Sequence, residues 1–357
     1  MSAPLADASL VESIDAFFAR RVSPELAAEV ERTGALPAEV WNELEGLGFT
    51  LVGISEESGG SGGSLLDAMS IVIAAGAHAA PLPLAESYAA AWLLEQAGLE
   101  IPSGPLTFVP GTTADTLDCQ ADRARGTVHR VPWGRGVSAV VAVAEHPEGW
   151  RVTVLDPAQA TLTPGADLAG TPSDSLTFEA DGVIGSGLVF LAEDPRWRLG
   201  LARTAQMAGA LSGILGLTVR YTGEREQFGR PIRAFQAVQE HIVTIAEAAE
   251  ITTMSVWRAA LASQERPSSF EIAAAKLVAT ESALHSVRAA HQAHGAIGMT
   301  REYPLHLYTR RLHAWRQELG TELALAGALG RAVRESGSIT TPVADGDHGV
   351  EVPWPTT

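Results

Sequence analysis

The first hundred residues place apolar side chains at the spacing of amphipathic helices. Leu10, Ile14 and Phe17 recur at intervals of three to four residues, and the mostly apolar run 65–78 has the length of a helix. Apolar residues spaced in this way bury one face of a helix. Residues 1–104 are therefore predicted to form an N-terminal helical domain.

A glycine-rich segment at 56–64 interrupts the helical pattern. No strand precedes it and no Lys-Ser/Thr pair follows it, which argues against a phosphate loop. We interpret it as a flexible connection.

The middle of the chain, residues 105–190, changes to short runs that are rich in β-branched residues. These runs lie at 106–109, 128–131, 137–143, 150–155 and 175–179. Segments rich in Pro, Gly and Asp separate them, a pattern typical of antiparallel strands joined by turns. A small middle β domain is predicted.

Helical periodicity returns over residues 191–335. Helices are expected over 201–225 and 235–263, then from Pro267, where Ser268 and Glu271 stand in capping-box register, and finally over 321–334. The small residues Ala208, Gly209, Ala210, Gly213 and Gly216 permit close helix contacts, either in the core or between subunits. A C-terminal four-helix bundle follows, and residues 336–357 are expected to be a loose tail. The fold class is thus mainly α with a small β domain (α+β).

Composition narrows the class of protein. The 42 acidic and 25 basic side chains give a formal charge of −17, which disfavours nucleic acid and anionic membranes as partners. The single cysteine, Cys119, excludes an internal disulfide and a Cys-cluster metal site. Without an apolar stretch of membrane-spanning length or a leader pattern, a cytoplasmic protein is expected.

Three C-terminal segments carry a family resemblance. They are Arg225-Glu-Gln-Phe-Gly-Arg-Pro-Ile232 with 234–239, the segment Gln292–Pro304, and Arg310-Arg311 followed by 319–321. In this order, and with Glu56-Glu57 and the glycines after them, the chain resembles the acyl-CoA dehydrogenase family over nearly its whole length. The resemblance implies the same three-domain order.

This resemblance also implies a chemistry. The family uses FAD to oxidise a fatty or sterol-derived acyl-CoA to its trans-2-enoyl-CoA. A glutamate removes the α-proton while the β-hydrogen leaves as hydride to the flavin, and hydrogen bonds hold the thioester carbonyl. An electron-transfer flavoprotein then accepts the electrons.

The family binds FAD across a subunit interface, and the resemblance assigns contacts to this chain. Arg225 aligns with the arginine that meets the pyrophosphate, where a planar guanidinium suits bidentate binding. The other aligned cofactor contacts are Gln227, Phe228, Phe235, Gln236, Gln292, Gly295 and Ala296. His291 and His294 share a helix face but lack a third ligand nearby, so they are expected to pack rather than bind a metal, and no metal site is predicted.

The usual catalytic residues are missing. The family's glutamate precedes the Gly-Thr of the third segment, and Leu319 occupies that position; an alternative base position on the first bundle helix falls at Leu199. Glu318 is one residue away, but neighbouring helical positions point about 100° apart. The middle domain also lacks the family's Thr-Glu-Pro-x-x-Gly-Ser-Asp run. No catalytic residue is therefore expected in this chain.

Three interpretations follow. The first is the non-catalytic chain of a heteromeric α2β2 acyl-CoA dehydrogenase, like those of actinobacterial steroid side-chain degradation, which lends FAD contacts in trans to a homologous catalytic subunit. The second is a self-sufficient FAD-dependent acyl-CoA dehydrogenase that uses Glu318 or another base, with a flavin-dependent oxidase or monooxygenase as a variant. The third is a flavin-free structural or acyl-CoA-binding module.

Overall fold

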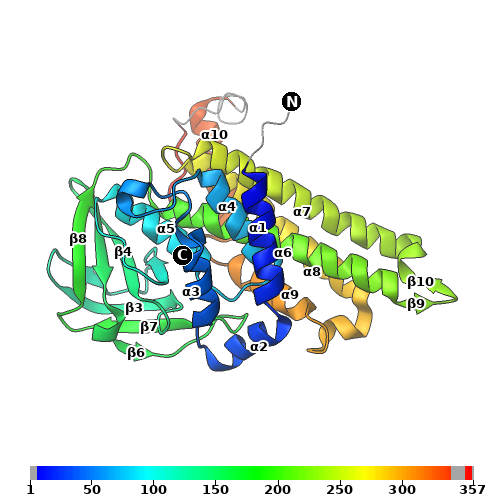
Figure 1. Ribbon diagram of the computed structural model, residues 1–357. Coiled ribbons are helices and arrows are strands. Elements are labelled where there is room, and N and C mark those ends of the chain that lie inside the picture. The colour runs from blue at the N-terminus through cyan, green and yellow to red at the C-terminus, as the bar shows by residue number, and fades with distance from the viewer. Residues whose placement is uncertain (1–5, 339–349, 356–357) are drawn as a thin grey trace.

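The computed structural model describes residues 6–338 and 350–355, which form a helical part, a β part and a second helical part in sequence order. In space the strands of the β part lie together at one end of the molecule, and the helices lie beside them (Figure 1). The N-terminal part consists of α1 (Ala8–Arg21), α2 (Pro24–Thr33), α3 (Ala38–Gly46), α4 (Leu65–Ala77) and α5 (Leu84–Gln96), with the 3-10 turns η1 (Phe49–Leu51) and η2 (Glu56–Ser58). The predicted class, mainly α with a small β domain, is confirmed.

Local hydrogen bonds explain where some helices begin. At the start of α4 the Ser64 hydroxyl accepts the Asp67 N–H at 3.2 Å, and the Asp67 carboxylate accepts the Ser64 N–H at 2.8 Å. This is a capping box. The box predicted at Ser268 and Glu271 is wrong, because the Ser268 side chain caps no helical N–H and Glu271 binds Arg258 at 2.9 Å.

The glycine-rich segment 56–64 is folded back on the chain before it, rather than being a flexible connection as predicted. Gly62 N–H donates to Ile54 O at 2.8 Å, and Gly53 N–H donates to Gly62 O at 2.7 Å. A Cβ on Gly60 would lie 2.3 Å from Ile54 O, so only glycine permits this approach.

The middle part contains two four-stranded sheets, confirming the predicted β domain. The strands are β1 (Leu106–Val109), β2 (Asp118–Cys119), β3 (Ala124–Pro132), β4 (Ala139–His146), β5 (Gly149–Leu155), β6 (Thr161–Thr163), β7 (Ser173–Phe178) and β8 (Val183–Val189), with η3 (Pro157–Gln159) between β5 and β6. The sheets have the orders β1-β4-β5-β8 and β2-β3-β7-β6. All their strand pairs are antiparallel except β1 on β4, which is parallel.

The first sheet is covered on both faces. Phe108, Val141 and Val152 pack with the apolar face of α5, whereas Val109, Val140 and Leu155 join the core shared with the second sheet. The β domain is thereby attached to the helices through α5.

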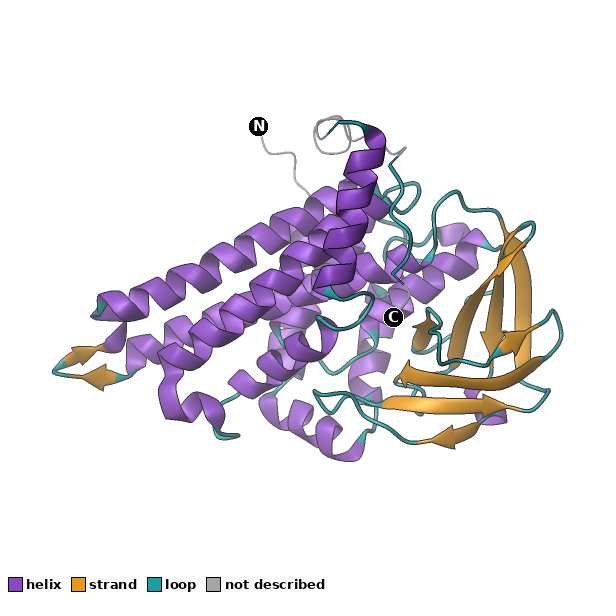
Figure 2. Cartoon of the chain, turned by 180° about the vertical axis from the view of Figure 1, so that it is seen from behind, coloured by secondary structure: helices purple, strands orange, loops and turns teal. Residues whose placement is uncertain are grey.

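The C-terminal part is a bundle of α6 (Arg196–Glu224), α7 (Gln236–Ala262), α8 (Ser269–His294) and α10 (Glu322–Ser336), as Figure 2 shows from behind. Between them lie β9 (Glu226–Gln227), β10 (Arg230–Pro231), η4 (Ile232–Ala234), η5 (Gly295–Met299) and α9 (Leu305–Trp315). The four predicted bundle helices are present, and α9 was not predicted. Helix α6 begins five residues earlier than expected, where the Asp194 carboxylate accepts the Arg196 N–H at 2.9 Å.

The small-residue face of α6 is used inside the chain. A Cβ on Gly209 would lie 1.9 Å from Ile73 O, and a Cβ on Gly76 would lie 2.2 Å from Gln206 O. Helices α4 and α6 therefore cross with their backbones in contact, and the pattern needs no second subunit to explain it.

The last described residues, 350–355, pack onto the bundle. Val352 N–H donates to Ser269 Oγ at 2.9 Å, Trp197 Nε1 donates to Val352 O at 3.1 Å, and Trp354 meets Trp197 edge to face at 4.9 Å. The prediction of a loose tail is wrong for these residues. Positions 339–349 and 356–357 of that tail lie outside the described residues.

Candidate functional site

A cavity of about 430 Å³ lies between the β sheets and the bundle; we call it the sheet–bundle cavity. Its walls come from β1 and the residues after it, from the end of β3, from the loop before β7, from α6 and from the segment that follows α9. Trp133, Leu199, Trp315 and Leu319 supply apolar surface. A partly apolar cavity with a few convergent polar groups is the usual form of a ligand site.

The two positions where the family's base is expected meet in this cavity. Leu199 on α6 and Leu319 after α9 both line it, although 120 positions separate them in the sequence (319 − 199). Leu319 has a φ of +59°, in the left-handed region that leucine rarely adopts. Neither side chain can take a proton.

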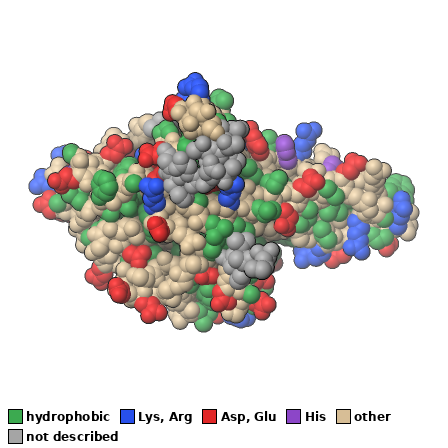
Figure 3. All heavy atoms as spheres, turned by 90° about the horizontal axis from the view of Figure 1, so that it is seen from above, with side chains coloured by type: hydrophobic (Ala, Val, Ile, Leu, Met, Phe, Trp, Pro, Cys, Tyr) green, Lys and Arg blue, Asp and Glu red, His purple; other side chains and the backbone are tan. Residues whose placement is uncertain are grey.

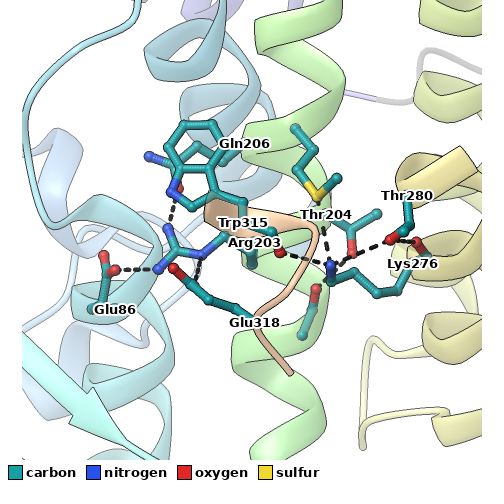
Figure 4. A network of polar contacts seen from close by, with 10 residues as sticks. Glu86, Arg203, Thr204, Gln206, Lys276, Thr280, Trp315 and Glu318 are labelled. Atoms are coloured by element: carbon teal, nitrogen blue, oxygen red, sulfur yellow. Dashed lines mark hydrogen bonds and ion pairs between the residues drawn. The ribbon is translucent and has the colours of Figure 1, made fainter. Parts of the chain in front are cut away.

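Glu318 also lines the cavity, but its carboxylate is bound. Arg203 on α6 donates from Nε to Glu318 at 2.8 Å, and the same guanidinium binds Glu86 and Gln206 (Figure 4). Arg203 and Glu86 are buried. Burial lowers the pKa of Arg203, but the attraction of Glu318 and Glu86 outweighs it and the pKa is raised. The Glu318 carboxylate is therefore engaged in an ion pair with a buried guanidinium.

Lys276 lies beside this network, fully buried on α8 (Figure 4). Its Nζ donates to Trp315 O at 2.9 Å and lies 3.5 Å from Thr280 Oγ1. Burial lowers its pKa to about 7. Lys276 thus fixes the end of α9, from which the segment carrying Glu318 and Leu319 departs.

Sequence reasoning missed Arg203, Glu86, Lys276 and Asp167. Asp167 lines the cavity in the loop before β7 and accepts the Thr171 N–H at 2.8 Å. Burial raises its pKa. One signal was available: Lys276 is the only lysine in the sequence, inside an apolar helix.

The aligned FAD residues lie at the other end of the bundle. Arg225 lies at the C-terminal end of α6, and Arg203 precedes it by 22 positions. Because a helix rises 1.5 Å per residue, roughly 33 Å separates the two residues. Gln227 and Phe228 form the β9–β10 hairpin at the tip seen in Figure 1, and Phe228 is 92% exposed. Phe235 packs edge to face on Phe228, with ring centroids 6.0 Å apart, and exposed Gln236 begins α7.

Gln292, Gly295 and Ala296 join the same end. Tyr221 on α6 stacks on His294 at 4.7 Å, which brings the ends of α6 and α8 together. Gln292, Gly295 and Ala296 are exposed. The structure therefore brings the aligned cofactor residues into one region of surface but keeps them away from the cavity of their own chain.

The histidines serve packing. His294 is buried and its Nδ1 lies 2.8 Å from Ala290 O, while burial lowers the pKa of both His291 and His294. Within residues 6–338 and 350–355, no group of three or more His, Cys, Asp or Glu side chains is placed to hold a metal ion. No helix in the described part of the chain has the length and apolar character to cross a membrane.

Comparison with known families identifies the class. The acyl-CoA dehydrogenase N-terminal domain matches residues 6–100, and the acyl-CoA dehydrogenase C-terminal domain matches residues 196–333. These matches cover more than half of the chain, which belongs to the acyl-CoA dehydrogenase family.

Individual relatives agree. The chain is 30% identical to acyl-CoA dehydrogenase IpdE2 of Mycolicibacterium smegmatis over 326 residues, covering 87% of this chain and 93% of that protein. It is also 30% identical to acyl-CoA dehydrogenase FadE34 of Mycobacterium tuberculosis over 298 residues, covering 77% of this chain but only 40% of that longer protein.

Solved structures confirm the fold. A chain of the ChsE4-ChsE5 complex from Mycobacterium tuberculosis superposes with a TM-score of 0.82 at 22% identity, covering 94% of this chain and 98% of that chain. A chain of the Tcur3481-Tcur3483 steroid acyl-CoA dehydrogenase variant superposes with a TM-score of 0.81 at 24% identity, covering 92% of this chain and 98% of that chain.

Proposed function

We propose that this chain is the non-catalytic subunit of a heteromeric acyl-CoA dehydrogenase. A homologous catalytic subunit supplies the base and the flavin-ring pocket, and this chain lends FAD contacts in trans, in an α2β2 assembly. The pair oxidises an acyl-CoA, of steroid side-chain origin by analogy with its relatives, and passes electrons to an electron-transfer flavoprotein.

The observation that carries the proposal is the sheet–bundle cavity. Both base positions in it hold leucine, and Glu318 beside them is paired with Arg203 at 2.8 Å. Proton abstraction needs a group that is free to accept a proton near the operating pH. Leu199 and Leu319 carry no such group, and the Glu318 carboxylate is engaged by Arg203.

The far end of the bundle supports a role in trans. Arg225 is exposed, and its guanidinium makes no ion pair with any described residue. The donor set fits a pyrophosphate, because a guanidinium binds phosphate oxygens in pairs and Gly295, with open space where a Cβ would be, lets a diphosphate approach the backbone. FAD, when bound, supplies the hydride acceptor of the reaction.

An apolar stripe on α7 supports a partner subunit. Val243, Ile251, Met254 and Leu261 are each about half or more exposed, and their spacing puts them on one helix face. Figure 3 shows hydrophobic side chains between the charged ones along the arm formed by this end of the bundle. Exposed apolar surface of this kind marks a protein interface. In two structural relatives, the ChsE4-ChsE5 and Tcur3481-Tcur3483 structures, two differently named chains occur together.

One observation favours a second function, a self-sufficient dehydrogenase. Asp167 lines the cavity, and burial raises its pKa, which suits a carboxylate for proton transfer. Asp167 is the weaker candidate, because it already accepts a hydrogen bond from the Thr171 N–H and lies far in sequence from both expected base positions.

The test is flavin content. The chain expressed alone is expected to be folded and colourless, and to yield about one FAD per pair when co-expressed with its catalytic partner. Arg225→Ala should lower FAD occupancy of the pair, while Arg32→Ala, at an exposed pair with Glu29, should not. A yellow, active homo-oligomer that loses activity on Asp167→Asn would overturn the proposal in favour of the self-sufficient enzyme.

A further inference from the structure

A second cavity, of about 340 Å³, lies between α4, α5, the start of α6 and the glycine-rich segment. We call it the α4–α5–α6 cavity. It shares no lining residue with the sheet–bundle cavity. The neighbouring residues Arg198 and Leu199 line different cavities, because consecutive helix positions point about 100° apart.

Arg198 is the unusual group in this cavity. Its side chain is only 4% exposed, and within the described residues it has no ion pair within 4 Å. Its buried Nε has no hydrogen-bond partner. A buried charge without a hydrogen-bonded partner is costly, and proteins normally pair it.

The neighbours of Arg198 provide no hydrogen-bond acceptor for its Nε. Its guanidinium lies over the Trp92 ring at 4.4 Å from the centroid, which orients the group but accepts no hydrogen bond. Glu95 attracts it, but Glu95 Oε1 accepts the Ser55 N–H at 2.9 Å. Burial lowers the pKa of Arg198 to about 9, a sign that its charge is poorly compensated.

The rest of the cavity wall is mixed. Val52, Leu65, Ala68, Met69 and Ala202 are apolar, while Ser64, Glu95, Gln264 and Glu265 are polar or acidic. The volume far exceeds the ~30 Å³ of a single water. A planar fork of donors beside apolar walls suits a carboxylate on an apolar body better than a compact phosphate.

We propose that the α4–α5–α6 cavity binds a small organic acid, whose carboxylate pairs with Arg198 and whose apolar part packs against Met69 and Ala202. The carboxylate belongs either to a free acid or to the far end of an acyl thioester. The site depends on neither the bound flavin nor the partner subunit, so it can be tested on the chain alone.

The experiment measures binding to the purified full chain by calorimetry and thermal shift. Hexanoate probes the free acid, with hexanamide as its neutral match. Adipoyl-CoA, which ends in a carboxylate, probes the thioester source, with hexanoyl-CoA as its match. We expect one acid of these two pairs to bind at least about tenfold more tightly than its neutral match, since hydrogen bonds to charged groups are strong.

Arg198→Met should abolish that preference, and Arg32→Met, at an exposed pair outside the cavity, should keep it. Removing an unpaired buried charge is expected to leave the fold intact or more stable. Arg198→Lys, which keeps the charge without the fork, should retain part of the preference. Equal binding of acids and neutral matches, an unchanged preference in Arg198→Met, or tighter binding of inorganic phosphate than of either acid would overturn the proposal.

Discussion

Glu318 is held 2.8 Å from Nε of Arg203, one residue before Leu319, the position where the family resemblance predicts the base. The buried guanidinium also binds Glu86 and packs near Trp315, 5.4 Å from its ring centroid. Glu318, which is next to the expected base position in the sequence, thus neutralises the charge of Arg203. We propose that this network is structural, and measurements of stability test that role.

Glu86→Gln should destabilise the chain strongly. Both Glu86 and Arg203 are buried, and removing one member of a buried ion pair costs about 3–5 kcal/mol, here toward the lower end because Glu318 still binds the guanidinium. Glu318→Gln should cost about 1 kcal/mol, because its side chain is one-third exposed and water can replace it. Urea unfolding measures both.

Glu322→Gln is the matched control, because Glu322 lies 3.5 Å from Arg316 at the surface. This substitution should leave the free energy of unfolding nearly unchanged. If Glu86→Gln and Glu318→Gln lower the free energy of unfolding equally, the buried pair of Glu86 with Arg203 does not stabilise the chain more than the partly exposed pair of Glu318 with Arg203.

Lys276 should make stability rise with pH above neutrality. Its pKa is lowered to about 7 in the folded chain, against about 10.4 when unfolded. Between these values the unfolded state binds a proton that the native state does not, so the free energy of unfolding increases with pH, by at most about 1.4 kcal/mol per unit. Below pH 7 Lys276 is protonated in both states, and the full cost of burying its charge then lowers the free energy of unfolding.

Because Lys276 is the only lysine, its protonation can be measured directly. The protein labelled with ¹⁵N-lysine should give a single Nζ titration with a midpoint near 7. In Lys276→Met the rise in urea stability between pH 7 and 9 should be reduced relative to the wild type, while contributions such as that of Arg198 stay common to both. A midpoint near 10 would contradict the assignment.

The helices and the sequence of domains could be predicted because their signals are local. Long apolar stripes with helical period survive in any tertiary context, and α6, α7, α8 and α10 follow them. Strand β8 has no such signal, since Gly185 and Gly187 dilute its β-branched pattern.

The candidate site depends on contacts between distant segments. Arg203 and Glu86 are 117 positions apart, and the sequence around neither residue predicts that they form a pair. The capping box at Ser268 failed for the same reason, because a long-range ion pair with Arg258 took Glu271. The leucines at the base positions were found only because the family resemblance said where to look.

Trp354→Ala should cost about 3 kcal/mol of unfolding free energy, because Trp354 is mostly buried against Trp197 and large-to-small changes at packed tryptophans cost this much. Thermal or urea unfolding measures it. Pro353→Ala, at an exposed neighbouring position, is the control. Unfolding at the wild-type midpoint would mean that residues 350–355 do not pack on the bundle in solution.

The apolar stripe on α7 should be required for assembly with the catalytic partner. Ile251 and Met254 are 57% and 68% exposed in the chain, so replacing both with Asp disturbs no core packing. In an interface, each Asp would lose its hydration without gaining a partner, which costs several kcal/mol. We expect at least about a hundredfold weaker association with the partner in a pull-down or calorimetric titration. Leu47→Asp, an equally exposed apolar position on the N-terminal part, should assemble normally. If the double variant assembles as well as the wild type and keeps one FAD per pair, the partner binds elsewhere and the stripe has another role.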